Sequence, residues 1–355
     1  MRAWEKNVRK TLPYVPGEQP RDLDIIKLNT NENPYPPSPK VQKTLEKMEM
    51  RTLRKYPDPA AGDLVSAIAR RYQVKESQVF VGVGSDDVLA MCFLTFFNGE
   101  KPILFPDITY SFYEVWAQVF RIPFERQPLD ENFRIDPEDY RKENGGVIFP
   151  NPNAPTGELL ALETVEEMIA ANQDSVVIVD EAYIDFGGKS ALPFIEKYDN
   201  LLVVQTFSKS RSMAGARLGF ALGSRELIAD LERLKYATNP YNVNRLTLRL
   251  GEAAVDSDPY FRANARRIMA TRDKTARALR EMGFRLPDSQ ANFLFVTHPR
   301  IDGARLYQKC RERGILIRHF SDPAIAQYNR VTIGAEEEME TFLTVVRDIL
   351  REEGL

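Results

Sequence analysis

Short apolar runs alternate with segments of helical periodicity along most of the chain. The apolar runs, bounded by polar residues or glycine, are typical of strands buried on both faces. They cover residues 79–83, 103–105, 146–150, 175–179, 201–204 and 219–223. Apolar positions with helical spacing fall in residues 41–50, 63–72, 88–97, 162–171 and 225–236. Because strands that alternate with helices form parallel sheets, we expect an α/β fold with a mostly parallel sheet and helices on both faces.

The pattern changes after residues 239–244, which we interpret as a crossover to a second domain. A long helix is expected over residues 260–282. Strands at 292–296, 315–318 and 329–333 follow, with helices at 303–313 and 336–352. Before the first helix, two prolines and a glycine in residues 13–17 argue against a continuous helix. We therefore predict an N-terminal arm (1–30), a large domain (31–245) and a small α+β C-terminal domain (246–355) that packs with the N-terminal segment.

Composition narrows the class of protein. The chain has 355 residues, more than one hydrophobic core usually serves, with 43% apolar and 28% charged residues. A net charge of −3 implies no basic face, so we expect no nucleic-acid partner. No apolar run reaches the length of a membrane-spanning helix, and the basic N-terminus lacks the apolar segment of a secretory signal. Cys92 and Cys310 fit no metal-ligand spacing, which favours reduced thiols in a cytoplasmic protein without a metal site.

Polar side chains follow three of the predicted strands directly. Asn153 comes after the strand at 146–150, Asp180 and Tyr183 end the next, and Ser208 and Lys209 follow the third. Carboxyl ends of parallel strands meet at one edge of an open sheet, where α/β proteins bind ligands. With only two histidines in the chain, Lys209 is our candidate base.

Each of these residues has an ordinary structural interpretation when it is taken alone. A single lysine or arginine is usually a surface charge, and a strand-end aspartate is usually a cap or turn residue. A single aromatic ring is as often plain core packing. The combination of Lys209 with small residues and with Arg217 eight positions later is far more specific.

The segment Ser-Lys-x-x-x-x-Ala-Gly-x-Arg-x-Gly at residues 208–219 resembles the cofactor-lysine segment of fold-type I enzymes that use pyridoxal 5′-phosphate (PLP), the aspartate aminotransferase superfamily. The resemblance implies a large domain with a mostly parallel seven-stranded sheet, flanked by helices, and a smaller α+β domain. It also implies that Lys209 bonds to the PLP aldehyde and that Ser208 and Arg217 bind its phosphate. Asp180 would pair with the ring nitrogen, and Tyr183 with the phenolic oxygen.

Further positions match this superfamily. Ser85 and Asp86 would bind the phosphate through backbone N–H groups after a glycine turn, and Tyr110 would stack on the ring. Tyr56 matches a tyrosine that reaches the neighbouring subunit's site, which implies a homodimer. One departure concerns the phenolic oxygen, because the asparagine that usually binds it is replaced by Ala154. We expect Asn153 to substitute, and if it cannot reach, Tyr183 would bind that oxygen alone.

Within the superfamily the resemblance is closest to the histidinol-phosphate aminotransferases. It rests on the segments Asn-Val-Arg at 7–9 with Pro-Tyr at 13–14, Leu-Asn-x-Asn-Glu-Asn-Pro at 28–34, Arg-x-Tyr-Pro at 54–57 and Arg-x-Thr-Ile-Gly at 330–334. It implies that Tyr14, Arg318 and Arg330 hold the phosphate or carboxylate of small-molecule substrates, and that Asn33 contributes to substrate binding. The implied reaction converts L-histidinol phosphate and 2-oxoglutarate to imidazole-acetol phosphate and L-glutamate.

Several alternatives remain open at this point. A threonine-phosphate decarboxylase-like lyase has the same type of cofactor site, and a broad aromatic or aspartate aminotransferase would share most of these residues. A non-catalytic PLP-binding regulator or a nucleotide-binding α/β protein is disfavoured, because both Lys209 and Asp180 are present. Turnover on each substrate separates the enzymes.

Overall fold

The computed structural model of the chain describes residues 2–11, 13–20 and 24–355. Residues 1, 12 and 21–23 of the expected N-terminal arm lie outside the described residues.

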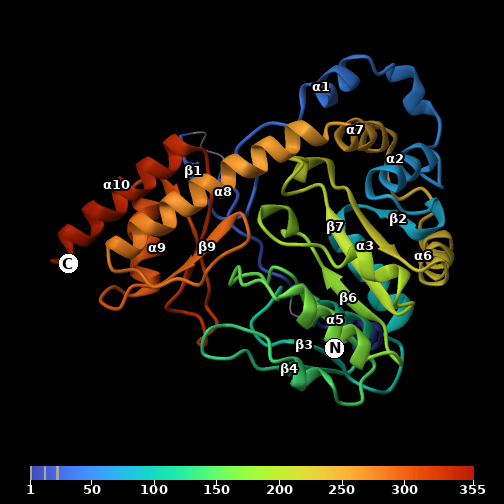
Figure 1. The fold of residues 1–355 in the computed structure, drawn as a ribbon, viewed down its shortest axis with the longest axis horizontal. Coiled ribbons are helices and arrows are strands. Elements are labelled where there is room, and N and C mark those ends of the chain that lie inside the picture. Colours follow the sequence, from blue (N-terminus) through green and yellow to red (C-terminus); the bar gives the residue numbers. More distant parts are fainter. Residues whose placement is uncertain (1, 12, 21–23) are drawn as a thin grey trace.

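The larger part of the fold is built on a seven-stranded sheet (Figure 1). Its strand order is β2-β8-β7-β6-β5-β3-β4, and only β8 runs antiparallel to its neighbours. The strands are β2 (Val79–Gly82), β3 (Ile103–Pro106), β4 (Phe124–Gln127), β5 (Gly146–Pro150), β6 (Val177–Asp180), β7 (Leu201–Thr206) and β8 (Gly219–Gly223). The predicted mostly parallel seven-stranded sheet is thereby confirmed. Strand β4 was not predicted, because Glu125 and Arg126 are exposed on this edge strand and interrupt its apolar pattern.

Alternate residues of the central strands belong to two separate hydrophobic clusters. In β6, for example, Val177 and Val179 face one side of the sheet, whereas Ile178 faces the other. Both faces are buried because helices cover each of them, as parallel sheets require. Helices α3 (Gly84–Phe96), α4 (Phe112–Phe120) and α6 (Arg225–Thr238) cover one face, and α2 (Gly62–Tyr72), α5 (Leu162–Ala171) and α7 (Arg245–Val255) cover the other.

Helix α7 was not predicted from the sequence. Gly251 weakens its helical pattern, but the absent side chain is what lets the helix pack closely. A Cβ atom at Gly251 would lie only 2.4 Å from the side chain of Leu218. The helix is capped by the side chain of Asn244, which accepts from the backbone N–H of Thr247, and it packs against α2 and α1 (Pro39–Glu46).

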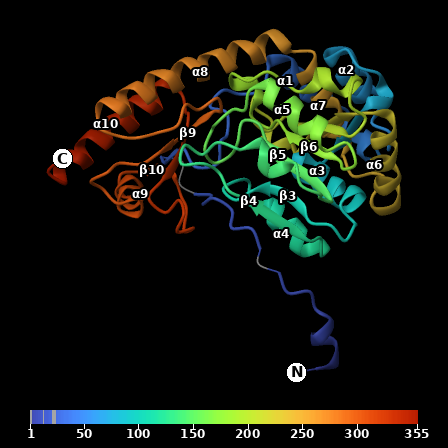
Figure 2. The same ribbon diagram turned by 60° about the horizontal axis from the view of Figure 1, so that its bottom comes forward.

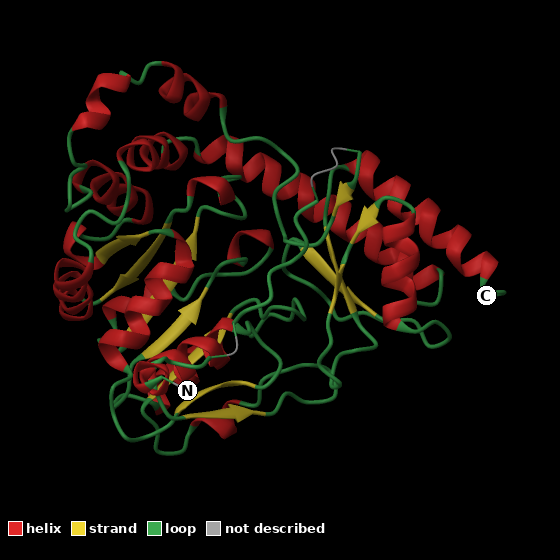
Figure 3. Cartoon of the chain, turned by 180° about the vertical axis from the view of Figure 1, so that it is seen from behind, coloured by secondary structure: helices red, strands yellow, loops and turns green. Residues whose placement is uncertain are grey.

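Helix α8 (Asp258–Glu281) runs from the large sheet to the smaller part of the fold (Figure 1). There a three-stranded antiparallel sheet, β11-β12-β9, packs with α9 (Gly303–Glu312) and α10 (Glu336–Glu352) around a third hydrophobic cluster (Figure 3). Its strands are β9 (Phe293–Val296), β11 (Arg318–His319) and β12 (Asn329–Thr332).

The single strand expected at 315–318 is divided in two. Its first half, β10 (Ile315–Leu316), pairs in parallel with β1 (Ile26–Lys27) of the N-terminal segment, and its second half becomes β11. Residues 2–11 project from the body of the molecule (Figure 2). The exact limits of arm, large domain and small domain stay predictions.

Candidate active site

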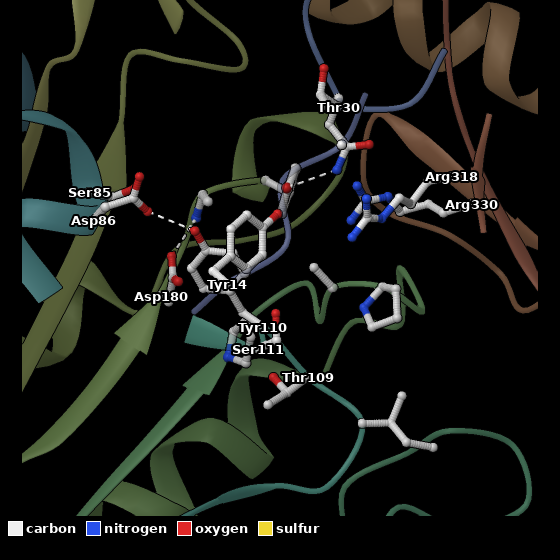
Figure 4. Close-up of a pocket in the computed structure, with 18 of the residues that line it drawn as sticks. Tyr14, Thr30, Ser85, Asp86, Thr109, Tyr110, Ser111, Asp180, Arg318 and Arg330 are labelled. Atoms are coloured by element: carbon white, nitrogen blue, oxygen red, sulfur yellow. Dashed lines mark hydrogen bonds between the residues drawn. The ribbon is translucent and has the colours of Figure 1, made fainter. Parts of the chain in front are cut away.

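A cavity of about 400 Å³ opens at the carboxyl edge of β5, β6 and β7. Three separate parts of the chain line it: residues 14, 17 and 29–32 of the N-terminal segment, the large sheet with its strand-end loops, and the loops beside β11 and β12. Figure 4 shows Asp180, Ser85 and Asp86 on one flank, and the guanidinium groups of Arg318 and Arg330 together on the other. The topology therefore brings most of the predicted site residues together.

Lys209 lies in this cavity near the start of the loop after β7. Its Nζ donates to the carbonyl of Thr30 at 3.2 Å and lies 5.7 Å from the ring centroid of Tyr183. The amide of Asn33 donates to the Lys209 carbonyl at 2.9 Å and does not line the cavity. The structure thus places the Asn33 side chain outside the cavity, where it binds the backbone of Lys209, and not at the expected substrate-binding position.

Asp180 ends β6 at the floor of the cavity. Its Oδ2 accepts from the hydroxyl of Tyr113 at 2.9 Å, and its Oδ1 accepts from the backbone N–H of Ala182 at 3.2 Å. Burial raises the pKa of the Asp180 carboxyl to about 6, although both hydrogen bonds act in the opposite direction. A cation placed against this carboxylate would relieve the unfavourable burial of its charge.

Tyr183 presents its hydroxyl to the cavity from the loop after β6. Phe293 packs edge-on against its ring, with 5.1 Å between the centroids, which fixes the ring plane. The amide nitrogen of Asn31 donates to the Tyr183 hydroxyl oxygen at 2.9 Å.

Asn153 does not enter the cavity, contrary to expectation. Its amide nitrogen donates to the Ile108 carbonyl at 2.9 Å, and its oxygen accepts from the Thr109 hydroxyl at 3.0 Å. Its side chain is buried and its hydrogen-bonding groups are already used. Ala154 lines the cavity instead, with a methyl group that can form no hydrogen bond. The structure therefore does not support Asn153 as a substitute for the usual asparagine.

The N-terminus of α3 meets the loop of Arg217 at the far end of the site. Gly84 has a φ of +80°, and a Cβ at Gly219 would lie 2.3 Å from the backbone nitrogen of Ser85. The two glycines thus allow the turn and the close approach. The backbone N–H groups of Ser85 and Asp86 lie in the first turn, where α-helices leave donors without internal partners.

Arg217 and Tyr110 both contact Asp86. Arg217 Nη2 lies 2.8 Å from Asp86 Oδ2, and the Tyr110 hydroxyl donates to Asp86 Oδ1 at 2.8 Å. The guanidinium has five donors, of which these contacts and a weak bond to the Ala214 carbonyl use only some. Ser208 also lines the cavity, where its hydroxyl oxygen accepts from the Thr206 hydroxyl at 3.0 Å.

Arg318 and Arg330 face each other across β11 and β12 as register partners. Arg318 donates to the Val15 carbonyl at 2.9 Å, and Arg330 donates to the Asn29 carbonyl at 3.2 Å. The Nε of Arg330 is buried without a hydrogen-bond partner in the described part of the chain. Like charges at directly opposite positions of two paired strands repel each other. An anion bound between the Arg318 and Arg330 guanidinium groups would relieve this repulsion. The ring of Tyr14 stacks on Phe112 beside them, with centroids 4.3 Å apart.

Tyr56 lies elsewhere on the described chain. Its side chain is 77% exposed, its ring stacks on Tyr241 with centroids 4.6 Å apart, and it does not line the cavity of its own chain.

Comparison with known proteins identifies the family. The family model described as "Aminotransferase class I and II" matches residues 23–346. The chain belongs to this aminotransferase family. It is 46% identical over 349 residues to the histidinol-phosphate aminotransferase of Lactococcus lactis subsp. cremoris (strain SK11), covering 98% of each chain. It is 50% identical over 351 residues to histidinol-phosphate aminotransferase 1 of Bordetella parapertussis (strain 12822), covering 98% of this chain and 99% of that protein.

A solved structure shares the fold of this aminotransferase. The crystal structure of histidinol-phosphate aminotransferase from Sinorhizobium meliloti, in complex with pyridoxal-5′-phosphate, matches with a TM-score of 0.84 at 22% identity. The match covers 92% of this chain and 91% of that one. At this identity the likeness establishes the fold alone.

Sequence reasoning missed two side chains in the aminotransferase site, Tyr113 and Asn31. Tyr113 lies in the apolar pattern of α4, which resembles ordinary core, and its hydroxyl was the only available signal. Asn31 lies in a polar loop whose partners come from distant parts of the chain. In the described ranges, no cluster of side chains suits a metal ion, and no helix is long and apolar enough to cross a membrane.

Proposed function

We propose that this aminotransferase uses PLP and interconverts L-histidinol phosphate and 2-oxoglutarate with imidazole-acetol phosphate and L-glutamate. The observation that carries the proposal is the position of Lys209, which shares one cavity with the buried Asp180 and the paired Arg318 and Arg330. The names of relatives that are 46–50% identical over nearly the whole chain support the same reaction.

The residues of the cavity fit PLP chemically. When bound, PLP accepts the substrate's amino group and takes up the electron pair that the substrate Cα releases. Asp180 supplies a buried negative charge of the kind that keeps a pyridine nitrogen protonated. Arg217, Ser208 and the N-terminus of α3 would hold the phosphate, and the ring of Tyr110 would pack against the cofactor ring.

Lys209 has the principal chemical role in this proposal. Its amine would hold the cofactor between reactions and, once freed, take the proton from the substrate Cα at Nζ. The Thr30 carbonyl and the Tyr183 ring keep that nitrogen in the cavity. The Tyr183 hydroxyl would donate to the phenolic oxygen of PLP.

The arginine pair accounts for the recognition of two substrates. Histidinol phosphate carries a phosphate, and glutamate carries a second carboxylate. Both groups accept paired hydrogen bonds from guanidinium. The free Nε of Arg330 and the neighbouring Arg318 would bind either anion. The stacked rings of Tyr14 and Phe112 are suited to an imidazole, and they also make a broader aromatic aminotransferase the second candidate.

We also propose a homodimer in which Tyr56 reaches the neighbouring site. Its exposed ring lies close to further exposed apolar residues of α6 and the following loop, Tyr236 and Tyr241. Such a group of aromatic side chains is typical of a protein interface.

The decisive experiment is the visible absorption spectrum of the PLP-loaded protein during titration with L-histidinol phosphate. We expect the cofactor band to bleach and to return when 2-oxoglutarate is added. If the band does not change when histidinol phosphate is added, and the protein releases carbon dioxide from phosphothreonine, the enzyme is a lyase instead. Equal turnover of free aromatic amino acids would favour the second candidate.

The Lys209→Ala variant tests the role of the lysine. We expect it to lose turnover while it keeps the unfolding midpoint of the parent protein. Lys189→Ala, which removes an exposed lysine, serves as the matched control. Substantial transamination by Lys209→Ala would disprove the assignment.

A further inference from the structure

Asn31 supplies an amide at a site where the chain lacks an expected one. Ala154 occupies the loop position where the resemblance implies an asparagine for the phenolic oxygen of PLP, and Asn153 is turned away from the cavity. Asn31 lines the same cavity from the N-terminal segment, with its side-chain nitrogen 2.9 Å from the Tyr183 hydroxyl.

The orientation of the Asn31 amide follows from Thr332 in β12. The Thr332 hydroxyl oxygen accepts from the Asn31 backbone N–H at 2.9 Å, and the hydroxyl donates to Asn31 Oδ1 at 3.1 Å. Because the Asn31 oxygen is engaged there, its NH₂ group must be the one that faces Tyr183. The Asn292 amide also donates to the Asn31 carbonyl at 3.0 Å. Asn31 is thus held by Thr332 of β12 and by Asn292, which directly precedes β9, while its side chain contacts Tyr183 in the loop after β6.

This arrangement determines the direction of the Tyr183 proton. The Tyr183 oxygen accepts the Asn31 hydrogen, so its own O–H is free to donate. No acceptor in the described part of the chain takes that proton. The remaining direction leads into the cavity, where the cofactor's phenolic oxygen would lie under the function proposed above.

We propose that Asn31 is a positioning residue for Tyr183: it directs the tyrosine hydroxyl toward the phenolic oxygen of PLP, in place of the amide lost at Ala154. The inference rests on the proposed function. It assigns to the N-terminal segment a part in the cofactor site, and not only in substrate recognition.

The backbone of Asn31 supports a specific requirement for this residue. Its φ is +56°, in the left-handed region that only glycine, asparagine and aspartate adopt readily. Among these three, only asparagine can donate to Tyr183 through its side chain. Glycine would satisfy the backbone alone, and an aspartate carboxylate would accept the tyrosine's proton and turn it away from the cavity.

A double-mutant cycle on the PLP-loaded protein tests the proposal. The variants are Asn31→Gly, Tyr183→Phe and the double variant, and the readouts are PLP affinity and the pH midpoint of the cofactor's absorption band. We expect Asn31→Gly to weaken PLP binding about threefold to tenfold, the value of one hydrogen bond. The midpoint should move to higher pH. Without a donated hydrogen bond, the phenolic oxygen of PLP keeps more negative charge and holds the proton that it shares with Lys209 Nζ more tightly. The double variant should match Tyr183→Phe alone.

Two further variants control for general damage. Thr332→Val keeps Asn31 but removes the hydroxyl that orients it, so a smaller shift of the midpoint in the same direction is expected. Asn329→Ala removes another buried amide of the same strand, one that donates to the Gly303 carbonyl, and should leave the midpoint unchanged. If Asn31→Gly does not fold, the pH midpoint of Thr332→Val still tests whether the orientation of Asn31 affects the cofactor.

The outcomes separate this inference from the proposed function. An unchanged midpoint in Asn31→Gly and Thr332→Val, or full additivity with Tyr183→Phe, overturns the positioning role while the cofactor assignment stands. Absence of any cofactor band in the parent protein after PLP is added overturns the proposed function itself.

Discussion

The hydroxyl of Tyr113 donates to Asp180 Oδ2 at 2.9 Å, from helix α4 to the end of strand β6. Both side chains are buried, and the second oxygen of Asp180 accepts from the Ala182 N–H. The carboxylate is therefore fixed from two sides before any ligand arrives. Its position at the floor of the cavity is a property of the folded protein, which is the condition for electrostatic catalysis without reorganisation.

We predict that Tyr113→Phe shifts the pH dependence of kcat/KM. Burial raises the pKa of Asp180 to about 6, and the Tyr113 hydrogen bond opposes that shift. Removing the bond raises the pKa further, so the acid limb of the profile moves to higher pH. The bond is present with and without the cofactor, so PLP affinity changes only through the pKa of Asp180: at pH 7 a larger share of the carboxyls is protonated, and we expect affinity to fall about twofold to tenfold. Tyr140→Phe is the control, because the buried Tyr140 hydroxyl has no partner in the described structure. Identical profiles in the two variants would contradict the prediction.

Arg330→Lys should raise KM for both substrates about a hundredfold, with a smaller effect on kcat. A lysine cannot form the paired hydrogen bonds of guanidinium, and the lost recognition is on the order of 2–3 kcal/mol. Steady-state kinetics with histidinol phosphate and with glutamate measure the effect. Arg300→Lys, at an exposed turn, should behave as the parent protein. A KM that rises for only one substrate would show that the arginine pair does not bind both anions.

Gly219→Ala should impair both folding stability and PLP binding. The added Cβ would lie 2.3 Å from the Ser85 backbone nitrogen, so the start of α3 must move. Such overpacking destabilises by about 1–3 kcal/mol, and the displaced N–H groups should bind phosphate about tenfold more weakly. Gly215→Ala, in the same loop, places its Cβ where nothing lies within 4 Å and should be nearly neutral. Denaturant unfolding and PLP titration of both variants provide the comparison.

Glu181→Gln should change how stability depends on pH. Burial raises the pKa of the Glu181 carboxyl to about 7, against its hydrogen bonds from Ser190, Ala191 and Gln205. The folded state therefore holds a proton that the unfolded state releases between about pH 4.5 and 7, so this group's contribution to stability falls as pH rises through that window. Relative to the parent protein, the variant should gain about 2–3 kcal/mol in the free energy of unfolding between pH 5 and pH 8. Urea denaturation of the cofactor-free proteins tests this, and parallel curves would refute it.

Co-expression of two impaired variants tests whether two chains share each site, as proposed. In a heterodimer of Lys209→Ala and Tyr56→Ala chains, one site carries both changes and the other carries neither. Activity should therefore reappear when the two chains are co-expressed, although each homodimer is impaired. No recovery, in a preparation shown to contain the heterodimer, would argue that Tyr56 acts within its own chain. Sedimentation analysis establishes the assembly.

Much of the large domain follows from the sequence because its strands are buried on both faces and form uninterrupted apolar runs. The features that escaped prediction are local exceptions to that rule. Strand β4 has exposed charges at the sheet edge, and Gly251 weakens the pattern of α7 where that helix packs closest. The division of residues 315–318 between two sheets depends on which strands pair, and this information is not contained in a short apolar run.

The site could be predicted where a residue's role depends on its place at a strand end, as with Lys209 and Asp180. It could not be predicted where the role depends on what lies across the fold. Asn153 and Asn33 were assigned to ligands, but nearby backbone groups take up their amides. Arg318 and Arg330 were both expected, from the resemblance, to hold the substrate's anionic group, but their position directly opposite each other is set by the register of β11 and β12.

The pairing of β1 with β10, together with the bonds from Thr332 and Asn292 to Asn31, has a consequence for biosynthesis. A chain emerging from the ribosome presents Ser85, Asp180, Lys209 and Arg217 well before Arg318 and Arg330. Domains generally fold in order of synthesis, so the strands of the large sheet can assemble early. The segment at residues 26–33 has no partner strand until the last part of the chain has left the exit tunnel. We expect a translating ribosome to carry an enzyme that is nearly folded but still unable to select its substrate.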